Sequence, residues 1–145
     1  MRNKFGRAAT TLFATTVLAL GGTLTAGAGT ASAAPSVTFK TSGSGGDFQI
    51  MVLRSDGVAI GYANWYQDPV GSQPGDALAA HDSAADGYGI EAHLSNGRVA
   101  TTRGHNAPYT DWATGDLPEG SKYTMWVCVV KDTYSNCSSK YTVSA

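Results

Sequence analysis

The sequence predicts an all-β protein that folds as a single antiparallel β-sandwich over residues 34–145. Val, Ile, Thr and Tyr recur in short runs that Gly, Asn, Asp and Pro separate, which is typical of short strands joined by turns. No segment keeps a helical period of apolar residues over three turns. The 112 residues of this range fit one compact domain and leave little room for a second.

The N-terminus has the order of a secretory signal peptide. Three basic residues precede a short apolar run, and small residues then lead to Ala31-Ser-Ala33, which is an A-x-A cleavage site. The apolar run is too short to span a membrane. We therefore expect residues 1–33 to be a cleaved signal peptide, no membrane span, and a secreted, extracellular protein that begins at Ala34.

The charge argues against nucleic acid and anionic membranes as partners. Residues 34–145 hold all eleven acidic residues but only seven of the ten basic ones, which gives this range a formal charge of −4. Binding to phosphate groups requires clustered Lys and Arg side chains. The sequence has no such cluster, so we expect no nucleic-acid partner.

Three strands are expected in the first third of the domain. The first covers 36–41 and ends at the glycine-rich segment 42–46. The second, 47–54, is apolar on both faces, which predicts a central position in its sheet. A tight turn then leads into the third strand, 58–65, and the loop 66–75 follows, because its two prolines and two glycines cannot support a ladder.

Residues 76–83 and 88–94 are predicted to form a hairpin about the turn 84–87, because Gly87 can adopt a positive φ angle. This pairing places two sets of alternating residues on one inward face: Ala77, Ala79, His81, Ile90, Ala92 and Leu94. His81 is therefore expected in the core, as a packed or hydrogen-bonded residue rather than a catalyst.

The dipeptide Asn96-Gly97 predicts a second hairpin, with a two-residue type I′ turn that joins Leu94 to Val99. Its register puts two polar residues on the solvent face beside two smaller ones: Glu91 and His93 beside Ala100 and Thr102. A carboxylate and an imidazole on one face could bind a metal together with a third group. The sequence places no third ligand, so we expect a solvated face and no metal.

A loop over 104–113 and then a long strand are expected before the C-terminus. The strand places alternate residues on one face, Tyr123, Met125, Val127 and Val129, and Met125 and Val127 are expected to fill the core. In an exported chain, the two cysteines, Cys128 and Cys137, favour a disulfide over a metal site or a redox pair. The short loop that this disulfide closes gives about 2–3 kcal/mol of stabilisation. A strand through Tyr141 and Val143 returns antiparallel.

One stretch near the C-terminus resembles the penultimate strand of fibronectin type III and related immunoglobulin-like sandwiches. It reads Leu117-Pro-Glu-Gly-Ser-Lys-Tyr123-Thr-Met-Trp-Val127-Cys-Val129. In those domains a Pro-Gly corner leads to a tyrosine whose hydroxyl folds back on the backbone. The resemblance covers roughly the last thirty residues. It implies an immunoglobulin-like or related sandwich in which Tyr123 holds the corner.

A second resemblance rests on a longer series of short motifs. They are Gly75-Asp-Ala-Leu, Asp82, Ala85-Asp-Gly87-Tyr-Gly, Leu117-Pro-Glu-Gly, Val127-Cys128 and Cys137-Ser. This order is similar to small exported actinobacterial proteins, most of them uncharacterised. Many of those carry two further cysteines, near the positions of His81 and Thr110, so the resemblance implies that this chain lacks one inter-strand disulfide. Some proteins of this kind are adaptor subunits of large secreted toxin particles used against competing bacteria.

The sequence offers no arrangement typical of catalysis. A hydrolase needs a nucleophile with a base, or paired carboxylates, near a cleft, and no G-x-S-x-G motif occurs. Both cysteines are expected in the disulfide. Asp82 and Asp86 lack the alternating acidic spacing of a calcium loop. We therefore predict a non-enzymatic protein without a cofactor.

Four aromatic residues are the candidate binding residues: Trp65, Tyr66, Tyr109 and Trp112. They lie in or beside the two longest loops, and rigid scaffolds present binding residues on such loops. Aromatic side chains dominate protein interfaces because they bury a large area with few rotatable bonds. An inward orientation of Trp65 and Trp112, which would cover the ends of the sandwich, is an equally good interpretation.

Small size, acidic charge and aromatic loops predict a protein that recognises another secreted or cell-surface protein. A more specific hypothesis is that the protein is an adaptor subunit of a secreted toxin assembly. A carbohydrate- or cell-wall-binding module is the alternative, because aromatic rings stack on the sugars of an extracellular polysaccharide and three polar residues lie nearby: Asn64, Gln67 and Asp68. An inhibitor of an extracellular hydrolase, acting through 68–74 or 106–110, ranks lower, since the disulfide does not hold these loops rigid.

Overall fold

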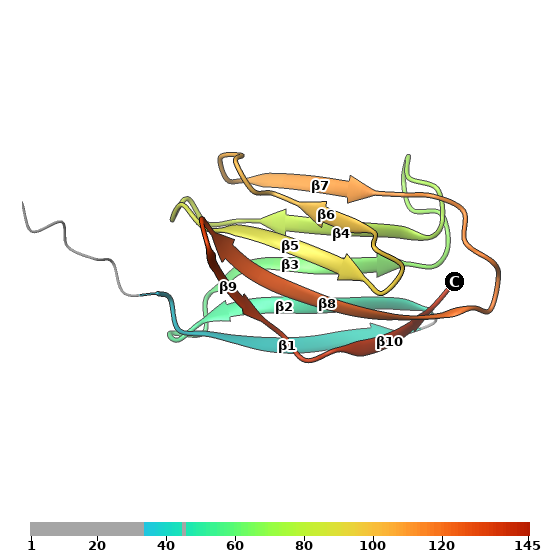
Figure 1. The fold of residues 1–145 in the computed structure, drawn as a ribbon, viewed down its shortest axis with the longest axis horizontal. Coiled ribbons are helices and arrows are strands. Elements are labelled where there is room, and N and C mark those ends of the chain that lie inside the picture. Colours follow the sequence, from blue (N-terminus) through green and yellow to red (C-terminus); the bar gives the residue numbers. More distant parts are fainter. Residues whose placement is uncertain (1–33, 45) are drawn as a thin grey trace, which may run out of the picture. The chain divides into compact units, whose positions relative to one another are not determined.

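Two antiparallel sheets pack face to face in a computed structural model, which describes residues 34–44 and 46–145 (Figure 1). The strands are β1 (Val37–Ser44), β2 (Asp47–Arg54), β3 (Ala59–Tyr66), β4 (Ala77–Asp82), β5 (Gly89–Leu94), β6 (Val99–Thr101), β7 (Tyr109–Ala113), β8 (Lys122–Lys131), β9 (Tyr134–Cys137) and β10 (Tyr141–Ser144). The first sheet has the order β1-β2-β3-β4-β7 and the second β10-β8-β5-β6, with β9 also paired to β8. The predicted single antiparallel β-sandwich is confirmed.

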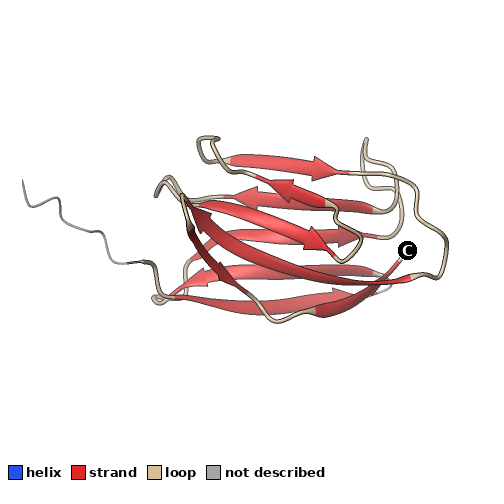
Figure 2. Ribbon diagram, in the orientation of Figure 1, coloured by secondary structure: helices blue, strands red, loops and turns tan. Residues whose placement is uncertain are grey.

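Strands and loops make up the whole of the described chain (Figure 2). Within it, no helix has the length and apolar character that a membrane crossing requires. The predicted signal peptide lies outside the described residues.

The core lies between the two sheets and consists of the alternate residues that each strand turns inward. Trp65 of β3 and Leu78 of β4 share one buried cluster with Ile90 of β5 and Val127 of β8. Burial of an apolar side chain of this size contributes about 1.5–3 kcal/mol. The shared core therefore holds the sheets together. The predicted central position of β2 is confirmed, since β2 pairs with β1 and β3.

The predicted loop 104–113 contains a strand. Residues Tyr109–Ala113 form β7, which pairs with β4 at the edge of the first sheet. The segment has only five residues and follows a proline, so its local sequence resembles a loop. Its strand conformation comes from the pairing with β4.

β4 and β5 do not form the predicted hairpin. β4 pairs with β3 and β7, whereas β5 pairs with β6 and β8 in the other sheet. Turn residues mark a change of direction equally well in a hairpin and in a crossing between sheets. The prediction of His81 in the core is also wrong, because Leu78 and Ala80 are the β4 residues that join the core and His81 lies on the outer face.

The Asn96-Gly97 turn is not of type I′. The Gly97 N–H donates to the Leu94 carbonyl (3.0 Å) and the Leu94 N–H to the Arg98 carbonyl (2.9 Å), which makes a three-residue connection. A type I′ turn needs a positive φ at both central residues. Here Gly97 has a φ of 90°, but Asn96 does not have a positive φ.

Because of this turn, the register of β5 against β6 differs by one residue from the predicted register. Glu91 lies opposite Thr101 rather than Thr102, and His93 is displaced in the same way. A displacement of one residue exchanges the two faces of a strand. Ala100 and Thr102 are therefore buried and do not lie beside Glu91 and His93 as predicted.

β8 and the disulfide agree with the predictions. Met125 and Val127 lie in the core, and β10 returns antiparallel to β8. Cys128 and Cys137 lie opposite each other on β8 and β9 and form the disulfide. The bond therefore fixes a local pair of strands of the second sheet.

The turn before β8 is held by the C-terminus. The Ser121 N–H donates to the Pro118 carbonyl (3.0 Å), which closes the predicted Pro-Gly corner. The Gly120 N–H donates to the Ala145 carbonyl (2.8 Å), and the Ala145 N–H donates to the Ser121 carbonyl (3.0 Å). Tyr123, which the resemblance places at this corner, packs against the core.

Candidate functional site

Three strands of the first sheet place aromatic side chains on its outer face. We call this surface the aromatic face, and it consists of Tyr62 and Tyr66 on β3, His81 on β4 and Trp112 on β7. Strand side chains alternate between two faces, so the β3 residues of this face alternate with the inward Trp65. All four residues of the aromatic face are partly exposed.

Tyr66 and Trp112 meet across β4. Their ring centroids are 5.7 Å apart, with 30° between the planes. Tyr66 lies opposite Ala77, and Trp112 lies opposite Ala79. Both alanines point outward by the strand period yet are 0% and 1% exposed. The small side chains therefore leave room for the two rings, and the rings cover the alanines.

Tyr62 and His81 form a second stacked pair beside the first. Their ring centroids are 4.6 Å apart. His81 Nδ1 lies 2.6 Å from Thr110 Oγ1, and these two residues are direct cross-strand partners. The register of β4 and β7 accounts for this contact without a catalytic role. Burial raises the pKa of the Tyr62 hydroxyl, and the nearby Tyr66 raises it further.

An open polar groove lies beside Tyr66. Its volume is about 410 Å³, and its polar lining comes from β1, β2 and β3: Ser42, Asp47, Gln49, Asn64 and Tyr66. Asn64 Nδ2 donates to the Tyr66 hydroxyl (2.6 Å). Asn64 Oδ1 is buried and has no hydrogen-bond partner among the described residues. The groove thus presents hydroxyl, amide and carboxylate groups next to an aromatic ring.

The four aromatic residues that the sequence singled out do not form one patch. Tyr66 and Trp112 come together on the aromatic face. Trp65 is fully buried, and its Nε1–H donates to the Ser144 carbonyl (2.9 Å). Tyr109 stacks on His105 of the β6–β7 loop, with ring centroids 3.9 Å apart. Of the two tryptophans for which an inward orientation was considered, Trp65 is buried, whereas Trp112 lies on the aromatic face.

Sequence reasoning missed Tyr62 and His81 as members of the aromatic face. The period of two along β3, which separates Tyr62, Asn64 and Tyr66 by single residues, could have found Tyr62. His81 was missed because the predicted hairpin assigned the wrong face of β4 to the core.

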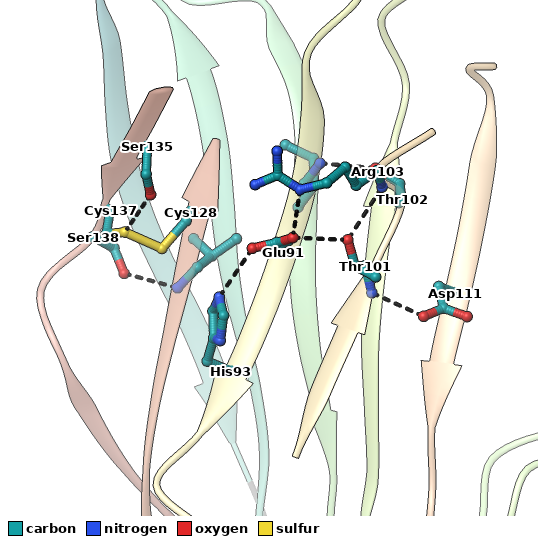
Figure 3. Close-up of polar contacts among 12 residues, drawn as sticks. Glu91, His93, Thr101, Thr102, Arg103, Asp111, Cys128, Ser135, Cys137 and Ser138 are labelled. Carbon is teal, nitrogen blue, oxygen red and sulfur yellow. Dashed lines mark hydrogen bonds and ion pairs between the residues drawn. A yellow bond between two sulfur atoms is a disulfide. The ribbon is translucent and has the colours of Figure 1, made fainter. Parts of the chain in front are cut away.

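The outer face of the second sheet carries a polar network (Figure 3). Glu91 Oε1 accepts hydrogen bonds from Arg103 Nε (2.9 Å) and from the Thr101 hydroxyl (3.1 Å). Its other oxygen, Oε2, lies 3.5 Å from His93 Nε2. Asp111 of β7 accepts a hydrogen bond from the Thr101 N–H (2.8 Å) at the edge of β6. These contacts join the two sheets along one side of the sandwich.

Glu91 and His93 in this network have lowered pKa values. Burial raises the pKa of Glu91, but the hydrogen bonds from Arg103 and Thr101 outweigh it, and the net shift is downward. Burial lowers the pKa of His93, and the neighbouring Glu91 opposes this effect only in part. In the described part of the chain, no three His, Cys, Asp or Glu side chains are placed to share a metal ion.

Trp126 occupies the same outer face, next to the disulfide strand pair. Its ring stacks on His93, with centroids 5.1 Å apart and 4° between the planes. Lys140 Nζ lies 4.7 Å from the centre of the Trp126 ring, within the range of a cation–π contact. Trp126 is therefore packed between neighbours of its own chain, although it is partly exposed.

Comparisons with protein-family models, with curated proteins and with solved structures found no match to this chain. Its function is therefore inferred from its own residues and their arrangement.

Proposed function

We propose that this chain is an exported, non-enzymatic protein that binds another secreted or cell-surface protein through its aromatic face. The observation that carries the proposal is the Tyr66–Trp112 pair, which lies partly exposed over Ala77 and Ala79. Rings fixed on regular strands offer a large contact area and lose little conformational entropy on binding. A more specific proposal is that the protein is an adaptor in a secreted toxin assembly. The sequence resemblance to small exported actinobacterial proteins supports this more specific role.

The proposed scaffold is immunoglobulin-like. In that fold, strands A, B and E are neighbours in one sheet, and strands C, F and G are neighbours in the other. The order β3-β4-β7 supports the first assignment and the order β5-β8-β10 the second, with the β1–β2 hairpin added beside strand A. The crossing from β4 to β5 then corresponds to the connection from strand B to strand C.

Affinity purification from culture supernatant tests the proposed recognition. The tagged protein is expected to recover a stoichiometric partner, and the double variant Tyr66→Ala/Trp112→Ala is expected to lose it. Trp126→Ala is the matched control, because Trp126 is also partly exposed but lies on the other sheet. Recovery of the monomer alone, or equal recovery of the partner by the double variant, would contradict the proposal.

A polysaccharide is the second candidate ligand, and the polar groove beside Tyr66 favours it. An aromatic ring next to amide and hydroxyl groups suits a sugar, whose apolar face stacks while its hydroxyls form hydrogen bonds. Sedimentation with chitin, cellulose and peptidoglycan tests this candidate. Retention on one polymer that Tyr66→Ala and Asn64→Ala both abolish would favour it over a protein partner, whereas no retention on any polymer removes it.

A further inference from the structure

A hollow lies away from the aromatic face, at one end of the second sheet. Its volume is about 600 Å³, and its walls come from the β4–β5 crossing, the β6–β7 loop and the β8–β9 turn. Gly89, opposite Val130, shares by the strand period the outer face that carries Glu91. Because Gly89 has no side chain, the surface is hollowed between Arg103 and Lys131, which both line the cavity.

A side chain at position 89 would be tightly packed against its neighbours. A Cβ atom on Gly89 would lie 3.2 Å from the backbone of Arg103 and 3.3 Å from Thr102 Oγ1. Gly87, with a φ of 77°, lines the same cavity, and a Cβ atom there would lie 3.1 Å from Lys131 Nζ. The two glycines thus keep the hollow open between its cationic walls.

Two cations face this cavity with unused hydrogen-bonding capacity. Arg103 donates from Nε to Glu91 and from Nη1 to the Asp132 carbonyl (3.1 Å), and its Nη2 has no partner among residues 34–44 and 46–145. Within the same residues, Lys131 has no carboxylate within 4.0 Å, and its Nζ lies 4.8 Å from the centre of the Tyr88 ring. Asp132 is the one acidic residue of the lining.

We propose that this cavity binds a carboxylate that carries an apolar group, as found in a small organic acid or at the C-terminus of a peptide. Lys131 and the free Nη2 of Arg103 bind the carboxylate, because charge-assisted hydrogen bonds to these groups are strong in a partly enclosed site. The apolar group of the ligand lies against the Tyr88 ring and against the backbone of Gly87 and Gly89. This site is independent of the proposed role of the aromatic face.

Chemical-shift titration of the ¹⁵N-labelled protein tests the site, with the amides of Gly87, Gly89 and Gly104 as reporters. N-acetyl-leucine is expected to cause saturable shifts at these amides, and the uncharged N-acetyl-leucinamide is not. Lys131→Met keeps the packing over Tyr88 and removes the charge, so affinity is expected to fall about tenfold or more. Lys140→Met, which removes a lysine of the β9–β10 connection outside the cavity, is expected to leave the titration unchanged.

The source of the carboxylate is resolved by two further ligands. Tighter binding of a tetrapeptide with a free C-terminal leucine than of N-acetyl-leucine indicates a peptide terminus, and equal binding indicates a small acid. Four results would overturn the proposal: no saturable shift, equal shifts with the amide, unchanged affinity in a folded Lys131→Met variant, or saturation by inorganic phosphate at a lower concentration than by N-acetyl-leucine. Thermal unfolding of each variant establishes that it is folded.

Discussion

Trp65 and Tyr66 are neighbours in the sequence, yet they serve opposite faces of the same strand. Trp65 is fully buried, and Tyr66 lies on the aromatic face. The period of two along β3 separates them, so their chemical similarity says nothing about a shared role. At the scale of the residue, position within the pleat decides between core and surface.

Replacement of Trp65 should therefore affect stability, and replacement of Trp112 should affect binding. We expect Trp65→Ala to lower the free energy of unfolding by about 3–5 kcal/mol, because it leaves a large cavity and an unpaired Ser144 carbonyl. Trp112→Ala, on the partly exposed outer face, should cost distinctly less. Urea unfolding followed by circular dichroism measures both changes, and equal losses would contradict this assignment.

Protonation of His93 should destabilise the fold. Since burial lowers its pKa below the ordinary value of 6.5, the imidazole binds a proton more readily in the unfolded chain. Stability is then complete above about pH 6.5 and falls as the pH drops through the window down to the folded-state pKa. The lowered pKa of Glu91 acts in the same direction, but only below its ordinary value of 4.5.

Urea titrations at pH 7.5, 6.5 and 5.5 measure the effect of His93. The wild-type free energy of unfolding should fall across this series, and His93→Gln should reduce the slope. Glu91→Gln keeps the imidazole and should retain a slope in this range. An unchanged slope in His93→Gln would show that other groups cause the acid sensitivity.

At the scale of the element, local sequence predicted where strands turn but not what the turns connect. The segments Ser55–Gly57 and Ser95–Gly97 both hold three-residue hairpin connections with a positive φ at the glycine. The segment 83–88 has similar turn residues, yet it carries the chain from one sheet to the other. The difference arises from strand partners far away in the sequence.

Positions 81 and 110 form a cross-strand pair suited to a disulfide. His81 and Thr110 lie directly opposite each other on β4 and β7 and are in hydrogen-bond contact. We expect His81→Cys/Thr110→Cys to form a bridge under oxidising conditions and to stabilise the fold by about 2–4 kcal/mol, offset by loss of the Tyr62 stacking.

Thiol titration and unfolding with and without reductant measure this change. The single variant His81→Cys is the matched control, because it loses the same imidazole contacts without gaining a bridge. Free thiols in the oxidised double variant would contradict the register of β4 and β7.

At the scale of the whole molecule, Arg98 ties the two sheets together at one end. Its guanidinium donates from Nη1 to the Asp76 carbonyl and from Nη2 to the Gly115 carbonyl (2.9 Å). Asp76 is 4% exposed, and its carboxylate accepts a hydrogen bond from the Leu117 N–H (2.8 Å). One side chain of the β5–β6 hairpin thus holds the start of β4 and the connection between β7 and β8.

Arg98→Met should lower the free energy of unfolding by about 1–3 kcal/mol, because two partly buried carbonyl groups lose their donors. Arg54→Met is the control, since Arg54 is exposed and, among the described residues, its side chain pairs with the nearby Asp56. That control should leave the free energy of unfolding close to the wild-type value. Equal effects of the two substitutions would contradict a role of Arg98 between the sheets.

The sequence by itself determined the sandwich class, the central position of β2, the alternation of β8 and the Cys128–Cys137 pairing, because these depend on local period and on the number of cysteines. Only the tertiary structure decided the crossing between β4 and β5, the strand at 109–113, and the aromatic face. These features depend on pairing between strands distant in the sequence, and a displacement of one residue exchanges the two faces of a strand. The two sheets therefore determine which aromatic side chains are buried and which are partly exposed.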